Sequence, residues 1–169
     1  WTSCLPHFRY VKNLIDQSAL GAVNYLKSDF GFKAHFDPDK RLFNKKLGGG
    51  SLLDIGIYPV YAALSLLGYP DEVKATASFS STGVDNQTHA LFSYNNGAIA
   101  VLNSTFLNTT ETETIIHCEN GFIRMNGRWH EPSSVDVVTN SGPEHYELDV
   151  QGNGSKFEAM EMMECLDEG

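Results

Sequence analysis

Cysteine is scarce in this chain of 169 residues, which contains only Cys4, Cys118 and Cys165. The three are widely spaced and form neither a CxxC pair nor a cluster with histidine. An odd number of scattered cysteines favours free thiols in a reducing compartment over a disulfide framework, and it argues against a structural zinc site. We therefore expect a cytoplasmic protein.

Positive charge is also scarce. Lysine and arginine number 12 against 21 aspartate and glutamate residues, which gives a formal net charge of −9. Nucleic acids are bound through clustered lysine and arginine, and the longest basic stretch, residues 40–46, is short and interrupted. The sequence also lacks a continuous apolar run of about 20 residues and a signal-peptide pattern. We expect no nucleic-acid partner and no membrane partner.

Several familiar chemical motifs are missing. There is no Gly-x-Ser-x-Gly nucleophile elbow and no phosphate-binding loop, and no Gly-x-Gly-x-x-Gly follows a predicted strand. The 6 histidines form no His-x-His or His-Glu-x-x-His spacing, so no metal site is predicted. By motif, this chain does not hold a nicotinamide cofactor by itself.

The pattern of apolar residues predicts the secondary structure of a single globular domain. Helical spacing predicts helices over residues 8–20, closed by Gly21, and over 155–168; residues 22–32 predict a strand, 33–46 a long loop and 52–67 a helix. From Glu72 a period of two predicts further strands over residues 73–81, 88–94, 98–106, 113–119, 121–126, 134–139 and 144–150. This order predicts an α+β fold, an open, mostly antiparallel sheet with helices on one face.

The strand over residues 98–106 is apolar on both sides. Ile99 and Val101 point one way, and Ala100, Leu102 and Phe106 point the other. Both sides of such a strand need a cover, and the predicted helices can cover only one. A second copy of the chain could cover the free side with its own sheet. The pattern therefore predicts a homodimer through the sheet face.

The most distinctive stretch is LGGGSLLDIGIY at residues 47–58. The three glycines free the backbone for a close approach, Ser51 is predicted as a helix N-cap, and Asp54 is predicted as the acidic half of a capping box. Residues 52–67 are apolar nearly all round, which is typical of a buried helix. Pro59 lies inside that helix and is expected to kink it near Ile55.

Asp54 and Tyr58 are four residues apart and therefore share one helix face. An acid and a phenol side by side suit proton transfer, yet each has a plainer interpretation: Asp54 as a cap and Tyr58 as a packed aromatic residue. The glycines, likewise, could serve only to let the helix dock, and Arg41 could be a solvated charge. A free phenol titrates near pH 10, and the motif contains no lysine to lower that pKa.

The run from Arg41 to Tyr58 resembles the hallmark of the Gfo/Idh/MocA oxidoreductases, and it is most similar to their dimeric dihydrodiol dehydrogenase and glucose–fructose oxidoreductase branch. Residues 1–23 resemble the helix and strand that follow the Rossmann domain of that family, and residues 84–100 resemble its central hairpin. The resemblance covers nearly the whole chain.

The resemblance implies a two-domain enzyme, in which an N-terminal Rossmann domain binds NAD or NADP and a C-terminal domain binds substrate and dimerises. Residues 1–169 are then expected to be the C-terminal domain, truncated at both ends and inactive by itself. The implied reaction is hydride transfer between the nicotinamide and a carbinol carbon of a sugar, diol or polyol. The competing interpretation is a non-catalytic sugar-binding or dimerisation module.

The resemblance also implies roles for particular residues. Asp54 would orient or polarise the substrate hydroxyl, and Tyr58 would exchange its proton, with a pKa lowered by a lysine in the absent domain. Arg41, Gly49 and Gly50 would approach the substrate. Sugar-alcohol members of the family carry histidine at the Tyr58 position, so tyrosine favours the dihydrodiol and aldose branch.

Overall fold

The computed structural model describes residues 1–148, 150 and 154–167 of the chain. Its regular helices are α1 (Pro6–Asp16), α2 (Ile57–Leu67) and α3 (Ser155–Asp167), and a π-helical turn over Leu52–Gly56 leads directly into α2. Short 3₁₀ turns occupy Thr2–Cys4, Arg41–Phe43 and Lys45–Leu47. The strands are β1 (Val23–Gly31), β2 (Glu72–Phe79), β3 (Asp85–Ser93), β4 (Ile99–Thr105), β5 (Thr114–Cys118), β6 (Gly121–Met125), β7 (Val135–Thr139) and β8 (Gly142–Tyr146).

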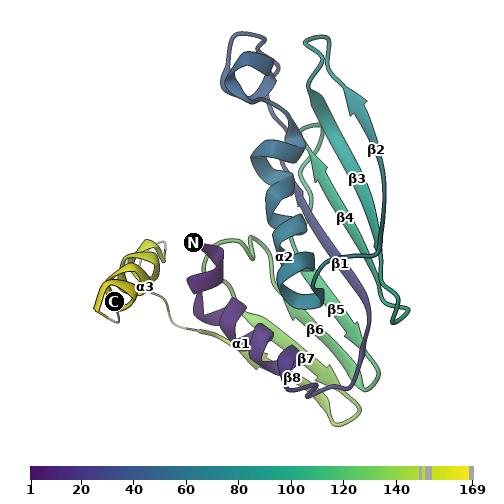
Figure 1. Ribbon diagram of the computed structural model, residues 1–169, viewed down its shortest axis with the longest axis vertical. Helices are drawn as coiled ribbons and strands as arrows, with labels where there is room; N and C mark the ends of the chain where they lie inside the picture. Colours follow the sequence, from purple (N-terminus) through teal and green to yellow (C-terminus); the bar gives the residue numbers. More distant parts are fainter. Residues whose placement is uncertain (149, 151–153, 168–169) are drawn as a thin grey trace.

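The strands form one open sheet in the order β2-β3-β4-β1-β5-β6-β7-β8. Every neighbouring pair is antiparallel except β1 and β4, which run parallel with Leu26 beside Ala100. Helices α1 and α2 lie on the same face of this sheet, whereas α3 stands away from it near the N-terminal turn (Figure 1). The predicted α+β class and the open, mostly antiparallel sheet are confirmed.

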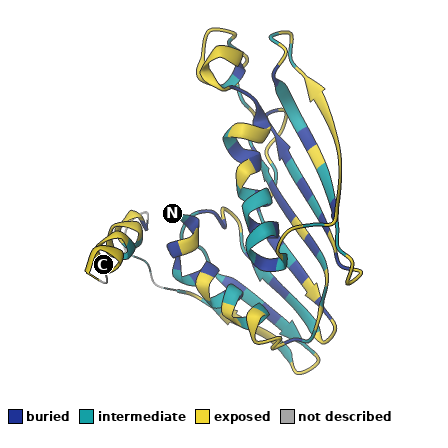
Figure 2. Cartoon of the chain, viewed as in Figure 1, coloured by how far each residue is buried: buried dark blue, intermediate teal, exposed yellow. Residues whose placement is uncertain are grey.

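The main core lies between the sheet and the two helices that cover it. On the sheet side it contains Leu26, Ala100, Leu102, Ile116, Ile123 and Met125, and on the helix side Phe8, Val11, Ala62, Ala63 and Leu66. In Figure 2 buried positions recur along the strands and along both α1 and α2. The alternation of each strand sends every second side chain into this layer, which is why the period of two located the sheet correctly.

The opposite face of the sheet has no cover within the described residues. Ile99 is 40% exposed there. Beside it Tyr25, His117 and Phe122 form a row of rings with centroid distances of 5.6 and 5.5 Å, and Arg124 lies 5.9 Å above the Phe122 ring. This face is therefore mixed, with an aromatic centre among polar side chains.

The first helix differs from its predicted bounds. It begins at Pro6, where the missing proline N–H costs nothing at a first helical position, and it ends at Asp16 rather than at residue 20. Gln17 is the C-cap and Ser18 takes the left-handed conformation with φ of 50°, so Gly21 does not end this helix. Ala19 N–H donates to the Leu14 carbonyl and Ser18 N–H to the Ile15 carbonyl, both at 2.9 Å, which are the 6→1 and 5→2 bonds of a Schellman motif that the sequence pattern did not indicate.

The strands are present where they were predicted, with shifted ends. The largest shift is in β8, which runs over Gly142–Tyr146 instead of residues 144–150, of which residue 149 lies outside the described residues. The last helix ends at Asp167, and the predicted end at residue 168 also lies outside them. Its expected apolar stripe does not pack as a stripe, since Met160, Met163 and Leu166 are exposed and only Phe157 contacts the core.

The stretch Lys45–Leu67 is, by length and composition alone, the one helical part of the described chain that could cross a membrane. Core helices of globular proteins also meet this test of length and hydropathy. In this stretch, 44% of the apolar window is buried inside the fold. The helix packs on β1 and β4 as a core element. The absence of a membrane partner stays a prediction.

Candidate active site

The helix that carries Asp54 and Tyr58 begins at a carboxylate from a neighbouring strand. Oδ2 of Asp85, the first residue of β3, accepts hydrogen bonds from the Ser51 hydroxyl and the Leu52 N–H, both at 2.7 Å, and from the Thr88 hydroxyl at 2.9 Å. An acceptor at this place satisfies N–H groups that the first helical turn leaves without a partner, and its charge suits the helix dipole.

The predicted capping box is therefore wrong. Ser51 already has helical angles, φ −65° and ψ −36°, and its side chain makes no capping hydrogen bond to its own helix. The first helical hydrogen bond runs from the Asp54 N–H to the Gly50 carbonyl at 3.1 Å. The capping acceptor comes from a residue more than 30 positions away in the chain, which a local sequence pattern does not reveal.

Gly49 and Gly50 are buried between the loop and β3 rather than open to a ligand. A Cβ on Gly49 would lie 2.6 Å from the Arg41 carbonyl oxygen, and one on Gly50, which has φ of +125°, would lie 2.3 Å from Oδ1 of Asp85. Both positions need glycine for chain packing. This supports the docking interpretation of the triglycine, and a contact of these glycines with substrate stays a prediction.

The helix itself is buried on only one face. Ile55, Gly56, Pro59 and the alanines of α2 face the sheet, and a Cβ on Gly56 would come within 2.9 Å of the Ser104 hydroxyl. On the other face Leu53 is 62% exposed and Ile57 is 49% exposed. The expectation of a helix buried all round is wrong. The kink expected from Pro59 near Ile55 stays a prediction; a π-helical turn occupies Leu52–Gly56 at that place.

Arg41 and Asp54 form an ion pair. The guanidinium Nη2 lies 2.5 Å from Oδ1 of Asp54, and the Asp54 side chain is 14% exposed while that of Arg41 is 58% exposed. The structure thus brings together two of the predicted site residues from the loop and the helix. Arg41 places a positive charge on the solvent side of the carboxylate, so the pair fixes the orientation of the Asp54 side chain.

Tyr58 lies one turn after Asp54 and lines an open cavity of about 370 Å³ together with Thr2, Ile57 and Tyr61 of the same chain. Burial raises the pKa of the Tyr58 phenol above its ordinary value, and the negative charges of Asp54 and Glu131 raise it further. The described residues around Tyr58 therefore hold its proton on, and proton donation near neutral pH needs a cation brought in beside the phenol.

His130 is the site residue that sequence reasoning missed. Its ring stacks on Phe30 with centroids 4.2 Å apart and contacts the Tyr58 ring at 5.0 Å. The residue is only 5% exposed, and this burial lowers the pKa of His130 to about 4, against the opposing effect of Glu131. Nothing in the local sequence pointed to this placement, because the contact joins the loop after β6 to α2 and β1.

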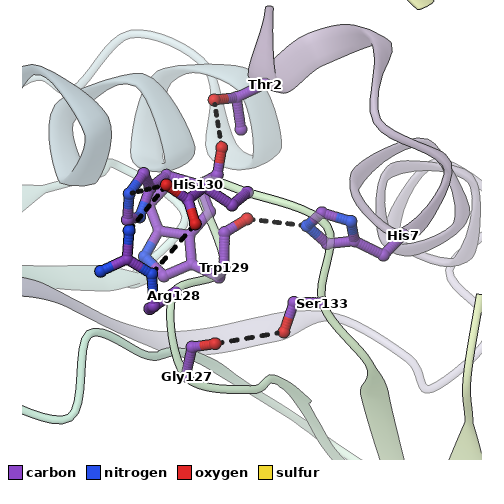
Figure 3. A network of polar contacts seen from close by, with 8 residues as sticks. Thr2, His7, Gly127, Arg128, Trp129, His130 and Ser133 are labelled. Carbon is purple, nitrogen blue, oxygen red and sulfur yellow. Dashed lines mark hydrogen bonds and ion pairs between the residues drawn. The ribbon is translucent and has the colours of Figure 1, made fainter. Parts of the chain in front are cut away.

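The loop that carries His130 is tied to the N-terminal helix by its main chain (Figure 3). The Thr2 hydroxyl donates to the His130 carbonyl at 3.2 Å, and Nε2 of His7 donates to the Trp129 carbonyl at 2.7 Å. Arg128 has a positive φ of 61°. Its guanidinium donates two hydrogen bonds, of 2.7 and 3.0 Å, to the Glu131 carboxylate. These contacts fix the loop before any ligand binds.

The arrangement places an acid, Asp54, and a phenol, Tyr58, on one helix. A buried imidazole, that of His130 in the loop after β6, lies against the phenol ring. No group of three or more His, Cys, Asp or Glu side chains within the described residues could hold a metal ion. The absence of a metal stays a prediction. The cavity beside Tyr58 has room for a small molecule, and the phenol could exchange a proton with it near neutral pH only with a cation brought in beside it.

The described residues form an open, mostly antiparallel sheet, with an ion-paired aspartate and a cavity-lining tyrosine on one of the helices that pack on it. The sequence model of the GFO/IDH/MocA C-terminal domain matches residues 8–124, so the chain belongs to this family, as its glycine–aspartate–tyrosine run predicted.

Curated relatives are similar over the whole chain or most of it. Trans-1,2-dihydrobenzene-1,2-diol dehydrogenase of Xenopus tropicalis is 28% identical over 180 residues, which cover 100% of this chain and 53% of the relative. The NADP-dependent scyllo-inositol 2-dehydrogenase of Bacillus subtilis is 30% identical, covering 83% of this chain and 44% of the relative. The chain spans about half the length of the curated relatives it matches.

Solved structures share the fold. An aldose–aldose oxidoreductase from Caulobacter crescentus superposes with a TM-score of 0.80 at 24% identity, covering 92% of this chain and 49% of the other. A 3-ketoreductase from Actinomadura kijaniata, in complex with NADP and TDP-benzene, superposes with a TM-score of 0.79 at 22% identity, covering 98% and 51%.

Removing the carboxylate at the helix start should destabilise the domain. Asp85→Ala deletes the acceptor shared by Ser51, Leu52 and Thr88, and we expect it to lower the free energy of unfolding by about 2 kcal/mol. Urea denaturation followed by circular dichroism measures this. The exposed Asp39→Ala is the matched control, expected to stay within about 0.5 kcal/mol of wild type. Equal stability of the two variants would contradict the anchoring role.

The buried imidazole should make stability depend on pH. His130 has a pKa of about 4 when folded and an ordinary value of 6.5, so in this interval the unfolded chain binds a proton that the folded chain does not. Stability therefore falls as the pH is lowered from 6.5 towards 4, and His130 contributes on the order of 3 kcal/mol to that fall.

His130→Phe should show a shallower loss of stability in the same interval. The remaining slope should include His7, whose pKa burial also lowers. Urea denaturation at several pH values measures it, with the exposed His35→Ala as the control that keeps the wild-type slope. A variant as pH-sensitive as wild type would mean that His130 is not buried as a neutral ring.

Proposed function

We propose that this chain is the substrate-binding and dimerisation domain of an NAD(P)-dependent oxidoreductase that transfers hydride between a nicotinamide and a carbinol carbon of a sugar, diol or polyol. The observation that carries the proposal is the placement of Asp54 and Tyr58 on one helix, the first paired with Arg41 and the second lining a cavity. Family membership and the dehydrogenase names of the relatives support it.

Each residue of the site has a distinct task in this proposal. Asp54, oriented by its ion pair with Arg41, accepts a hydrogen bond from a second hydroxyl of the substrate and so fixes the direction of the reacting one. Tyr58 takes the hydroxyl proton when an alcohol is oxidised and returns it when a carbonyl is reduced. The nicotinamide, when bound, accepts or supplies the hydride.

Tyr58 needs a cation that the described part of the chain does not place beside it. Asp54 and Glu131 both raise its pKa, so a positive group near the phenol would meet two carboxylates already in position. We propose that a lysine of an N-terminal Rossmann domain supplies this charge, and that the same domain binds NAD or NADP. Relatives named for NADP support a nicotinamide cofactor without fixing which one.

The exposed apolar face of α2 fits the same proposal. Leu53 and Ile57, together with Val60, Tyr61 and Leu64, line a shallow apolar hollow beside the Tyr58 cavity. An apolar surface of this kind next to a polar site is suited to contact with another domain. Docking of the Rossmann domain there would close the cavity over the substrate and exclude water.

The substrate class is proposed from the relatives. They are named for a dihydrodiol, an inositol and D-xylose, which share a secondary or anomeric hydroxyl flanked by further oxygen. We propose a substrate of this kind and a cytoplasmic location for the protein.

A non-catalytic module is the second candidate. The observation that favours it is that these motif residues have contacts that serve the fold. Gly49 packs against the backbone of Arg41 and Gly50 packs against Asp85, which binds the helix start, while the Arg41 side chain pairs with Asp54. The motif could therefore persist for folding alone. Turnover by the full-length protein separates the two candidates.

Loss of the phenol should abolish most catalysis in the full-length protein. We expect Tyr58→Phe to lower kcat by about 10²–10⁴-fold, because proton transfer loses its donor and acceptor, and Asp54→Asn to lower kcat as well. Steady-state kinetics with NAD⁺ or NADP⁺ and a sugar or diol measures both. The fully exposed Tyr69→Phe is the control. Wild-type turnover in Tyr58→Phe and Asp54→Asn would remove the catalytic assignment.

We also propose a homodimer through the uncovered face of the sheet, where Tyr25, His117 and Phe122 form their row of rings. Size-exclusion chromatography with light scattering at micromolar concentration should give twice the chain mass of 18.7 kDa. Phe122→Asp places a charge in the face and should give a monomer, whereas Tyr69→Asp, away from it, should not. A monomeric wild-type chain would refute the dimer.

A further inference from the structure

Three rings from distant parts of the chain meet at the proposed proton donor. Phe30 belongs to β1, Tyr58 to α2 and His130 to the loop after β6, and each ring contacts both others. The centroid distances are 4.2 Å for Phe30–His130, 5.0 Å for Tyr58–His130 and 5.7 Å for Phe30–Tyr58. The phenol ring of Tyr58 thus lies against two rings that come from outside its own helix.

His130 is the more tightly held of the two supports. Its side chain is almost completely buried, and its main-chain oxygen is bound by the Thr2 hydroxyl. The preceding carbonyl, on Trp129, is bound by His7 from α1, and the Glu131 N–H closes a turn onto the Arg128 carbonyl at 2.8 Å. A ring fixed by contacts on both sides of its backbone is a rigid surface for Tyr58 to lie against.

The imidazole supplies shape rather than charge. At neutral pH a histidine buried in this way carries no proton beyond its neutral form, so it cannot stabilise a phenolate as a cation would. Its Nδ1 atom has no hydrogen-bond partner within the described part of the chain. The contact that the geometry does show between His130 and Tyr58 is ring against ring, at an interplanar angle of 52°.

We propose that His130 is a positioning residue for Tyr58: its fixed ring, with Phe30 behind it, sets the orientation of the phenol so that its oxygen faces the substrate hydroxyl. This inference rests on the proposed function, since it gives Tyr58 the proton-transfer role. A small displacement of a reacting group can cost about 10²-fold in rate, so a support of this kind is kinetically significant.

The test uses the full-length protein, NAD⁺ or NADP⁺, and whichever of scyllo-inositol, D-xylose and trans-1,2-dihydrobenzene-1,2-diol it turns over. His130→Phe keeps a flat ring and should retain kcat within about threefold, while His130→Ala removes the ring and should lower kcat about 10- to 100-fold with KM changed less than about threefold. If the alanine variant does not fold, His130→Leu, which fills the space without a flat ring, takes its place. The exposed His35→Ala is the matched control.

A double-mutant cycle distinguishes positioning of Tyr58 from a general effect on folding. With Tyr58→Phe already present, His130→Ala should lower the residual kcat by less than about threefold, because the oxygen that it positions is gone. An equal loss in both backgrounds, wild-type kcat in His130→Ala, or a loss in His130→Phe as large as in His130→Ala would each overturn the proposal.

The pH dependence gives a second readout. A neutral positioning ring predicts the same profile of kcat between about pH 5.5 and 9 for wild type and His130→Phe, whereas an imidazolium in catalysis would add a limb near pH 6.5 that phenylalanine removes. The two failures remain distinct. Wild-type kcat in Tyr58→Phe would defeat the proposed function itself, while a Tyr58-dependent enzyme that is indifferent to His130 would defeat only this inference.

Discussion

The carboxylate of Asp85 is the contact on which the site depends. It binds the Ser51 hydroxyl and the Leu52 N–H and so decides where the helix starts on the sheet. Gly50 must lack a side chain because that same carboxylate lies against it. Once the start is fixed, the helical repeat places Asp54 beside Arg41 and Tyr58 one turn further on, over the rings of Phe30 and His130.

The electrostatics of the site are asymmetric. Asp54 has its counter-charge in Arg41, within the same chain, whereas Tyr58 has two acidic neighbours and no cation among the described residues. In the proposed mechanism, Asp54 is therefore already paired within this chain, whereas Tyr58 still requires a positive group from elsewhere. Such a division suits a site assembled from two bodies, because neither body alone then has the complete catalytic set.

Two of the uncovered surfaces within the described residues, one apolar and one mixed with an aromatic centre, lie on different sides of the fold. One is the outer face of α2, with Leu53 and Ile57, and the other is the uncovered sheet face around Ile99. The first adjoins the proposed site and the second does not. A domain contact on the first and a second copy on the second account for both surfaces with separate partners, so either association can be tested without disturbing the other.

The sequence by itself determined the class of fold, the positions of most strands and the family, because period-two alternation and a glycine–aspartate–tyrosine run are local patterns. It also indicated Asp54 and Tyr58 as candidate site residues that share one helix face. Only the tertiary structure decided that Asp85 rather than Asp54 caps the helix, that the helix is buried on one face, and that the His130 ring lies against Tyr58. These are contacts between residues far apart in the chain, and local propensity says nothing about which distant side chain a folded sheet will bring to a helix.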